Sequence, residues 1–293
     1  MKTTNITSPI AGCMRWGIWG ANFSTPQYRA MIEACLQNGI NSFDHADIYG
    51  DYTTEAGFGE ALKENASLRP QLKLITKCGI QMVTPNRSEH AIKSYNTSKK
   101  HILYSVETSL KNFGTDYIDV LLIHRPDPLL DPAEVAQVVE QLKQEGKILE
   151  FGVSNFLPHQ TDLLANYTSI SYNQVEISVI HLNSFTDGTL ENCIKHNITP
   201  MAWAPLGGGL FTDDSHPRFR SISTVAAELA EKYNTGLNEI LLAWLHTHPS
   251  GIVSVIGTTK IERLLQAKAA ASIRLEREDW FALLAASTGE DVA

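Results

Sequence analysis

Short apolar runs alternate along the chain with longer segments in which apolar residues recur at helical spacing. The apolar runs predict eight strands, at residues 9–14, 40–45, 72–77, 118–124, 148–154, 170–175, 198–204 and 252–256. The intervening segments predict helices at residues 27–38, 54–63, 98–113, 133–144, 159–165, 188–196, 224–233 and 261–270. In residues 98–113, for example, Ile102, Val106 and Leu110 follow one another at four-residue steps and share one helix face.

A strand followed by a helix, repeated eight times, predicts parallel strands joined by right-handed crossovers. Two features favour a closed (β/α)8 TIM barrel over a doubly wound sheet. No Gly-x-Gly-x-x-Gly sequence follows the first predicted strand, and eight units account for the 293 residues. No linker or change of composition divides the chain, so we predict an α/β fold with a single domain over residues 1–293.

Composition and charge exclude several classes of protein. Hydrophobic residues make up 43% and charged residues 19%, which predicts a large buried core and excludes a disordered chain. The net charge of −8 argues against nucleic acid as a partner, because a phosphate backbone requires a concentrated basic face. We find no apolar run long enough to span a membrane and no signal peptide. The four cysteines lack disulfide-like spacing, so we expect a reduced, cytoplasmic protein.

Reactive side chains stand where three consecutive predicted strands end. In a TIM barrel, the working residues lie at the C-terminal ends of the strands and in the loops that follow. The second predicted strand leads into Asp44 and Tyr49, the third ends in Lys77, and the fourth ends in His124. A lysine at the end of a buried strand needs a counter-ion, and Asp44 on the adjacent strand is the natural one. We therefore expect these four side chains to meet on one rim.

The four residue types suit proton transfer to a carbonyl oxygen. An ammonium near a phenol favours the phenolate, so we expect Lys77 to lower the pKa of Tyr49 from its reference value of about 10. Such a phenol can donate a proton, and His124 could orient the carbonyl or relay the proton. Each residue alone has an ordinary explanation: Lys77 could be solvated, Tyr49 could belong only to a turn, and His124 could satisfy loop backbone groups.

The motifs FDHADIYG, ITKCG, LLIHRPDP and FGVSNF, in this order and at these separations, resemble the aldo-keto reductase superfamily. The resemblance extends from about residue 10 to residue 289 and is nearest to a bacterial branch of oxidoreductases that carries FDHADIYG. It implies NADPH-dependent reduction of an aldehyde or ketone. It also implies a catalytic tetrad of Asp44, Tyr49, Lys77 and His124, in which Tyr49 is the general acid, Lys77 and Asp44 tune it, and His124 orients the carbonyl.

The resemblance further implies that NADPH or NADP+, with NADH as the alternative, binds across the barrel mouth. Ser154, Asn155 and Gln174 match the positions that hold the carboxamide, and Trp203 matches an aromatic ring stacked on the nicotinamide. The other matched positions are Met14, Pro205, Leu206, Gly207, Gly208, Gly257, Thr258, Thr259, Lys260 and Arg263. Among them, the glycines after Pro205 correspond to the pyrophosphate loop, and Thr258, Lys260 and Arg263 correspond to the contacts of the adenosine 2′-phosphate.

Two positions depart from the family pattern. His45 replaces the usual small hydroxyl residue after the catalytic aspartate and adds a titratable group, whose effect on the pH optimum is left open. Ala267 replaces an asparagine that often closes the adenosine motif, so one adenine contact is in doubt and the preference for NADP is not secured.

Two other function classes fit parts of the sequence. A metal-dependent barrel hydrolase would draw its ligands from Asp44, His45, Asp47, His124 and the His246-x-His248 pair, but we expect no metal. We interpret His246 and His248 as surface or core histidines, because they precede Pro249 at the end of a helical stretch and lack a carboxylate set. A cofactor-sensing regulatory subunit with little turnover would share the fold, since fold alone does not establish catalysis.

The expected partner is a small-molecule carbonyl substrate, with neither nucleic acid nor a membrane involved. Its identity would be set by the loops that carry Trp16, Trp19, Phe23, Trp203 and residues 210–219. The aromatic residues after the first strand fit an apolar pocket and a packed loop equally well. The charges of Arg125 and Asp127 fit either rim charges or substrate contacts, and the oligomeric state is not readable from the sequence.

Overall fold

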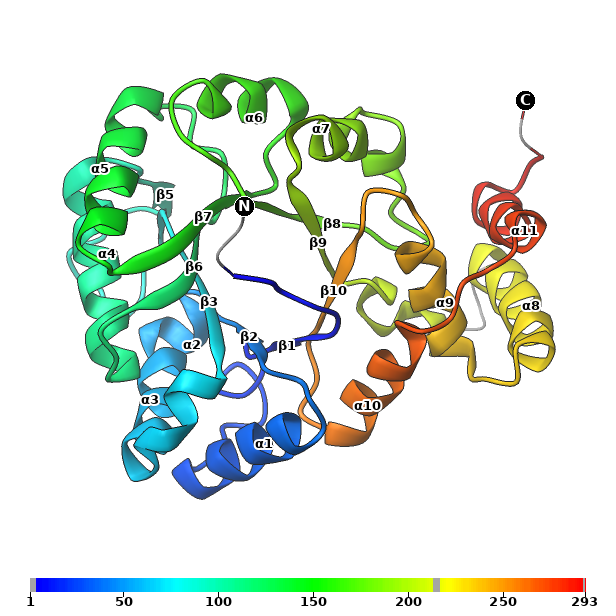
Figure 1. The fold of residues 1–293 in the computed structure, drawn as a ribbon, viewed down its shortest axis with the longest axis horizontal. Coiled ribbons are helices and arrows are strands. Elements are labelled where there is room, and N and C mark those ends of the chain that lie inside the picture. The colour runs from blue at the N-terminus through cyan, green and yellow to red at the C-terminus, as the bar shows by residue number, and fades with distance from the viewer. Residues whose placement is uncertain (1–3, 213–216, 292) are drawn as a thin grey trace.

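In a computed structural model, which describes residues 4–212, 217–291 and 293, eight parallel strands close into a barrel (Figure 1). Around the barrel the strands follow the order β1-β10-β9-β8-β7-β6-β3-β2. Their bounds are β1 (Ile10–Gly12), β2 (Ser42–Asp44), β3 (Lys73–Cys78), β6 (Ile118–Ile123), β7 (Ile148–Ser154), β8 (Tyr172–Glu176), β9 (Thr199–Trp203) and β10 (Val253–Ile256). The predicted (β/α)8 TIM barrel is therefore confirmed, and each strand overlaps its predicted range.

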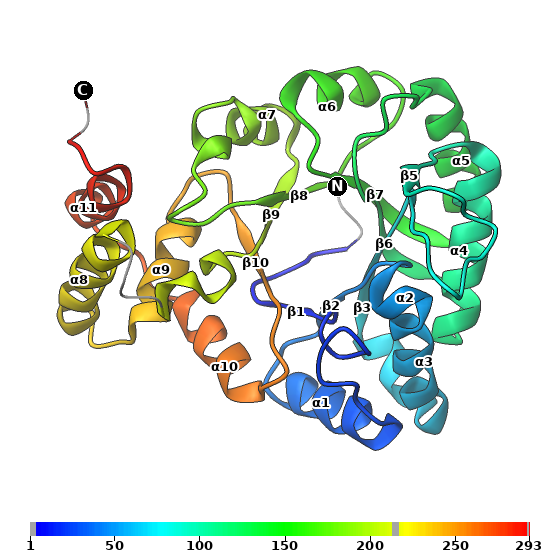
Figure 2. The ribbon, with the colours of Figure 1, turned by 180° about the vertical axis from the view of Figure 1, so that it is seen from behind.

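The predicted helices surround the barrel and cover the outer face of the strands (Figures 1 and 2). They are α1 (Thr25–Gln37), α3 (Thr54–Glu64), α4 (Lys99–Phe113), α5 (Pro132–Gln144), α6 (Pro158–Ala165), α7 (Thr189–His196), α8 (Pro217–Lys232) and α10 (Ile261–Ala270). Local signals set their ends: the Ser98 hydroxyl accepts the His101 N–H at the start of α4, and Gly114 ends that helix in the left-handed conformation.

Several elements were not predicted from the sequence. They are α2 (Tyr49–Tyr52), α9 (Leu237–His246), α11 (Arg277–Thr288), the short hairpin β4 (Ile80–Gln81) and β5 (Ser94–Tyr95), and the 3-10 segments η1 (Ala66–Gln71), η2 (Asn183–Phe185) and η3 (Gly207–Thr212). Figure 2 shows α8, α9 and α11 on one side of the barrel, where α11 lies outside the eight-fold repeat. Among the described residues, none of the helices combines the length and apolar composition that a bilayer crossing requires.

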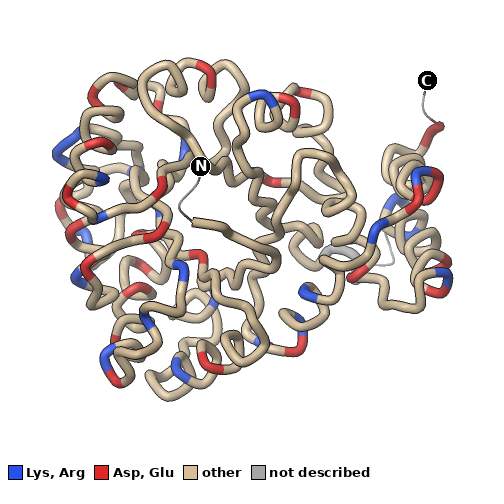
Figure 3. Tube along the Cα trace, viewed as in Figure 1, with Lys and Arg blue, Asp and Glu red and all other residues tan. Residues whose placement is uncertain are grey.

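The barrel interior is a packed core and not a channel. Apolar and aromatic side chains from six strands fill it, namely Ile10, Ile75, Val120, Leu122, Tyr172, Met201, Val253 and Val255. At the N-terminal end of the strands, the Tyr172 hydroxyl donates to the Thr4 carbonyl at 2.6 Å. In the view of Figure 3, basic and acidic residues are interspersed over the outer helices. The polar side chains at the C-terminal end of the barrel lie directly above this packed core.

Candidate active site

The four residues predicted from the strand ends lie on three neighbouring strands. Asp44 is the last residue of β2, Lys77 lies near the end of β3, and His124 directly follows β6. Tyr49 opens the short segment α2 after β2, in which Gly50 and Asp51 have a left-handed backbone. Because β2 pairs with β3 and β3 pairs with β6 in parallel register, their C-terminal ends meet at one edge of the barrel. The tetrad is thus brought to one rim, as the strand ends predict.

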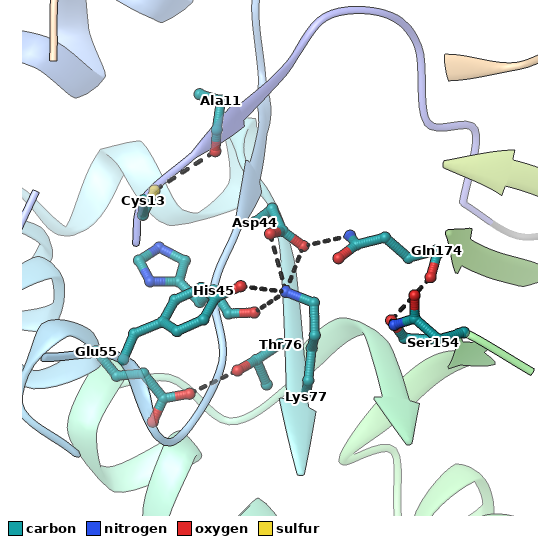
Figure 4. Close-up of polar contacts among 11 residues, drawn as sticks. Ala11, Cys13, Asp44, His45, Glu55, Thr76, Lys77, Ser154 and Gln174 are labelled. Carbon is teal, nitrogen blue, oxygen red and sulfur yellow. Dashed lines mark hydrogen bonds and ion pairs between the residues drawn. The ribbon is translucent and has the colours of Figure 1, made fainter. Parts of the chain in front are cut away.

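Lys77 is the centre of this group (Figure 4). Its side chain has no exposed surface, and its Nζ lies 2.8 and 2.9 Å from the two carboxylate oxygens of Asp44. The ammonium also donates to the His45 carbonyl at 2.6 Å and to the Tyr49 hydroxyl at 3.1 Å. Burial disfavours the charged form, but Asp44 and Tyr49 outweigh it and raise the pKa of Lys77 above its ordinary value. Lys77 is therefore a fixed cation.

Lys77 does lower the pKa of Tyr49, as expected, but the expected net decrease in that pKa is wrong. Burial raises the pKa of the phenol, the Lys77 ammonium lowers it by less, and the Asp44 carboxylate raises it further, so the pKa lies above its ordinary value. The main cause is burial, which disfavours the phenolate, and the carboxylate of Asp44 acts in the same direction. Tyr49 therefore keeps its proton at neutral pH.

His124 faces Tyr49 across the mouth. The two rings lie 6.1 Å apart between centroids and are nearly perpendicular. The His124 side chain is buried, and its Nδ1 has no hydrogen-bond partner among the described residues. Burial lowers the pKa of His124 well below its ordinary value, and the charges of Lys77 and Arg125 act in the same direction. The imidazole is therefore neutral and can offer one N–H to an oxygen atom.

His45 does not add a titrating group to the mouth. Its ring packs edge-on against Phe58 and Phe113, with centroids 4.7 and 5.0 Å away. Burial, assisted by the charge of Lys77, lowers the pKa of His45 to about 3. The question left open by the sequence is answered: His45 is neutral near pH 7 and belongs to the layer between the barrel and the helices.

The residues matched to the carboxamide form one hydrogen-bonded chain at the ends of β7, β8 and β9. The Trp203 indole donates to Asn155 Oδ1 at 3.0 Å, and Asn155 Nδ2 donates to Ser154 Oγ at 2.8 Å. Ser154 Oγ in turn donates to the Gln174 carbonyl, and Gln174 Nε2 donates to Asp44 Oδ1 at 2.7 Å (Figure 4). The bond from Gln174 to Asp44, which the sequence did not predict, links this series of hydrogen bonds to the tetrad. It also engages the amide nitrogen of Gln174 with the Asp44 carboxylate.

The remaining matched positions lie in three loops at the same end. Met14 follows β1 and is exposed, while Pro205 and Leu206 lead from β9 into η3. Gly207 and Gly208 have φ of 59° and 68°, and a Cβ on Gly208 would meet nothing within 4 Å. Their left-handed backbone favours glycine and leaves room beside it. Of residues 210–219, also expected at the mouth, residues 213–216 lie outside the described ranges.

The segment after β10 has the features of an anion site. Gly257, Thr258 and Thr259 connect β10 to Lys260, the residue that precedes α10, and Thr258 Oγ1 accepts the Lys260 N–H. Lys260 and Arg263 are exposed, and neither forms an ion pair with a residue that the structure describes. Unopposed cations at a helix N-terminus attract anions.

The aromatic residues after β1 divide between core and mouth. Trp16 is fully buried against Phe23, Tyr28, Phe43 and Phe58, and its indole donates to the Thr258 carbonyl at 2.8 Å. Trp16 is therefore part of a packed loop, and its hydrogen bond holds Thr258 in the segment that follows β10. Trp19 is half-buried, its ring centroid lies 6.2 Å from that of Tyr49, and its indole donates to Asp51. Trp19 therefore lies beside Tyr49 at the mouth, whereas Phe23 packs against the buried Trp16.

The metal-dependent alternative finds no ligand set in the parts of the chain that the structure describes. Within those ranges, no three His, Cys, Asp or Glu side chains are grouped so that they could hold a metal ion. His246 Nε2 instead bonds the hydroxyls of Ser8 and Ser254, and His248 Nδ1 bonds Ser250. Both histidines are structural.

The family follows from comparison with known proteins. Residues 10–287 match the model of the Aldo/keto reductase family. The chain belongs to this family. It is an NAD(P)H-dependent oxidoreductase that acts on carbonyl groups, and the predicted family membership is confirmed.

Three relatives illustrate the similarity of this aldo/keto reductase to known proteins. The chain is 45% identical to "Uncharacterized oxidoreductase YcsN" of Bacillus subtilis, covering 97% of this chain and 95% of that protein. It is 39% identical to a "6-dehydroglucose reductase" of Agrobacterium fabrum, covering 95% of each chain. A solved aldo/keto reductase of Klebsiella pneumoniae, in complex with NADP and acetate, superposes with a TM-score of 0.76 at 25% identity and covers 95% of this chain and 90% of its own.

Proposed function

We propose that this aldo/keto reductase reduces an aldehyde or ketone to an alcohol with NADPH, with Tyr49 as the general acid, Lys77 and Asp44 as its supports, and His124 as the group that orients the carbonyl. The observation that carries the proposal is the contact chain from Asp44 through Lys77 to Tyr49, with distances of 2.8 and 3.1 Å. A buried cation in contact with a protonated phenol can stabilise the phenolate that forms when the phenol donates its proton.

The raised pKa of Tyr49 supports a role as donor. Before reaction, the phenol is protonated and its hydroxyl lies at the mouth. As the proton passes to the carbonyl oxygen, a negative charge develops on Tyr49 Oη, and the Lys77 ammonium 3.1 Å away stabilises it. Asp44 and the His45 carbonyl hold that ammonium in place, so little reorganisation is needed.

A neutral His124 suits the orienting role. The imidazole can donate one hydrogen bond to the substrate oxygen and so place it near Tyr49. An imidazolium would repel Lys77 in the same buried space, and the low pKa of His124 prevents this. One group therefore positions the oxygen and another protonates it.

The residues at the mouth fit a nicotinamide dinucleotide. Trp203, held by its bond to Asn155, offers a fixed aromatic face for the nicotinamide, and the open backbone at Gly208 leaves room for a pyrophosphate. Lys260 and Arg263 suit the extra phosphate of NADPH. When bound, the reduced nicotinamide supplies the hydride that the carbonyl carbon receives.

Two relatives support these assignments. The NADP found with the Klebsiella pneumoniae reductase supports NADPH as the cofactor. The name of the Agrobacterium fabrum relative supports the inclusion of sugar-type carbonyl compounds among candidate substrates.

The test replaces the phenol and leaves the ring. Tyr49→Phe should lower kcat by about 100-fold or more, the usual contribution of a positioned general acid. NADPH fluorescence quenching should persist, because the hydroxyl is not needed for cofactor binding. Tyr52→Phe is the matched control, since Tyr52 lies in the same helix but bonds to the backbone of Ile80 and Met82. Near-normal turnover by Tyr49→Phe would exclude Tyr49 as the acid.

A further inference from the structure

Two charged residues, Arg125 and Asp127, follow His124 in the loop after β6. Of these two, Asp127 holds the loop in place through hydrogen bonds. Asp127 accepts hydrogen bonds from the Thr97 backbone N–H at 3.1 Å, the Thr97 hydroxyl at 2.9 Å and the Leu129 N–H at 2.8 Å. Both of its carboxylate oxygens are therefore engaged in fixing the loop after β6. Arg125 forms no such hydrogen bond with any residue that the structure describes, and its one described side-chain contact is with the Trp203 ring.

Arg125 lies beside His124, which the proposed function places at the carbonyl, and beside Trp203, which it places against the nicotinamide. It is the sequence neighbour of His124, and its charge contributes to the low pKa of that imidazole. Its guanidinium carbon lies 5.7 Å from the centroid of the Trp203 ring, within the range of a cation–π contact. Trp203 is at the end of β9, so the Arg125 side chain extends across the mouth from β6 past the ends of β7 and β8.

The guanidinium lacks acceptors among the residues that the structure describes. No acidic side chain there forms an ion pair with Arg125, and no oxygen accepts a hydrogen bond from it. Arg69, which is also partly buried, instead donates to Asp119, Thr115 and two carbonyls. Since a guanidinium has five N–H donors, Arg125 can still bind an incoming group with several acceptor oxygens.

We propose that Arg125 determines substrate specificity by binding acceptor oxygens, from a carboxylate or from hydroxyl groups, that the substrate carries close to its carbonyl. A purely alkyl carbonyl compound offers this cation no acceptor besides its carbonyl oxygen. The inference rests on the proposed function, because it takes the reacting carbonyl to lie at His124 and Tyr49, next to a nicotinamide held by Trp203.

The experiment compares three aldehydes that differ in these oxygens. Succinic semialdehyde carries a carboxylate, D-glyceraldehyde carries hydroxyls, and butanal carries neither. The value of kcat/KM is measured for each with saturating NADPH in the parent protein, in Arg125→Met and in Arg125→Lys. Arg277→Met is the matched control, since Arg277 lies over the Phe281 ring at 5.3 Å in α11, away from the mouth.

In Arg125→Met, kcat/KM for succinic semialdehyde relative to butanal should fall by about 10- to 100-fold, the range expected for hydrogen bonds to a charged group. The ratio for D-glyceraldehyde should fall several-fold, Arg125→Lys should retain part of each preference, and Arg277→Met should retain all of it. A fall for only one polar aldehyde would assign the site to its oxygens, a carboxylate or hydroxyls.

Two results would overturn the proposal. Equal losses for the three aldehydes would make Arg125 a structural residue, and weaker NADPH quenching in Arg125→Met would assign it to the cofactor. A parent protein that reduces none of a broad set of carbonyl compounds would instead contradict the proposed function itself.

Discussion

At the scale of single residues, His45 is a titratable side chain in an apolar place. Both ring nitrogens are buried without a hydrogen-bond partner among the described residues, and the ring packs between Phe58 and Phe113. Protonation would place a cation there, close to the Lys77 ammonium. The pKa of His45 is therefore about 3 in the folded protein, well below its ordinary value. Because this pKa differs between the folded and unfolded states, the free energy of unfolding depends on pH.

Replacement of His45 by leucine should expose this dependence. Between pH 6.5 and pH 3, the unfolded chain binds a proton at His45 and the folded protein does not, so the parent loses stability as the pH falls. The stability of His45→Leu relative to the parent should therefore increase on acidification, by about 1.4 kcal/mol per pH unit within this window. Urea denaturation at several pH values measures the difference.

Above pH 7 the difference between His45→Leu and the parent should be constant. A comparison with the parent is essential, because Asp47 acts in the opposite direction: burial raises its pKa to about 7, so it lowers stability as the pH rises from 4 to 7. A difference that does not change with pH would contradict a buried, neutral His45.

The sequence located the tetrad but not its electrostatics. The predicted ends of the strands identified Asp44, Lys77 and His124. Parallel strands of a barrel end at one edge, and only a few of the residues at that edge have reactive side chains. The pKa of Tyr49 was predicted in the wrong direction, since it depends on burial and on a carboxylate whose distance no spacing reports. The bond from Gln174 to Asp44 joins strands far apart in sequence and was not predictable for the same reason.

At the scale of elements, the tryptophans of α9 and α11 form a reciprocal pair. Trp244 and Trp280 stack with centroids 4.8 Å apart and an interplanar angle of 11°. Each indole N–H donates to the backbone carbonyl of the other residue, at 2.9 and 3.0 Å. The pair therefore attaches α11, which lies outside the barrel repeat, to a helix that packs on the barrel.

Trp280→Ala should lower the free energy of unfolding by about 3 kcal/mol, because the change removes a large aromatic contact and one indole donor. Trp280→Phe keeps the aromatic contact and loses only the N–H, so we expect about 1 kcal/mol. Urea denaturation followed by circular dichroism measures both. Equal losses for the two variants would show that stacking contributes little to the attachment of α11.

The same helices mark the limit of prediction from periodicity. Surface helices such as α4 were predicted because one face is apolar and the other polar. In α9, residues 240–245 are all buried, so no polar face marks the helical period. The helix α11 was missed for another reason. The sequence was divided into eight strand–helix units, and α11 is an additional helix after the eighth unit.

At the scale of the whole molecule, the cofactor site must bind a polyanion to a protein with a net charge of −8. At physiological ionic strength the Debye length is about 8 Å, so distant charges on the outer helices are largely screened. Local charges then decide affinity. Lys260 and Arg263 at the start of α10, together with the backbone N–H groups there, are placed to outweigh the overall charge.

Lys260→Gln combined with Arg263→Gln should raise the Kd of NADPH by about 10- to 100-fold, as expected for two lost charge-assisted contacts. The Kd of NADH should change by less than about threefold, because NADH lacks the 2′-phosphate that these cations are expected to meet. Fluorescence titrations at low and physiological salt measure both constants, and the salt dependence for NADPH should become weaker in the double variant.

The matched control for this pair is Lys100→Gln combined with Lys111→Gln on the exposed face of α4. Both double variants change the net charge by the same amount. A difference in NADPH affinity between them therefore reports the position of the charges and not the overall charge. If the control weakened NADPH binding equally, the field of the whole molecule would set the affinity. If NADH and NADPH lost affinity equally in Lys260→Gln with Arg263→Gln, these cations would contact a part common to both cofactors, and the proposed preference for NADPH would need another source.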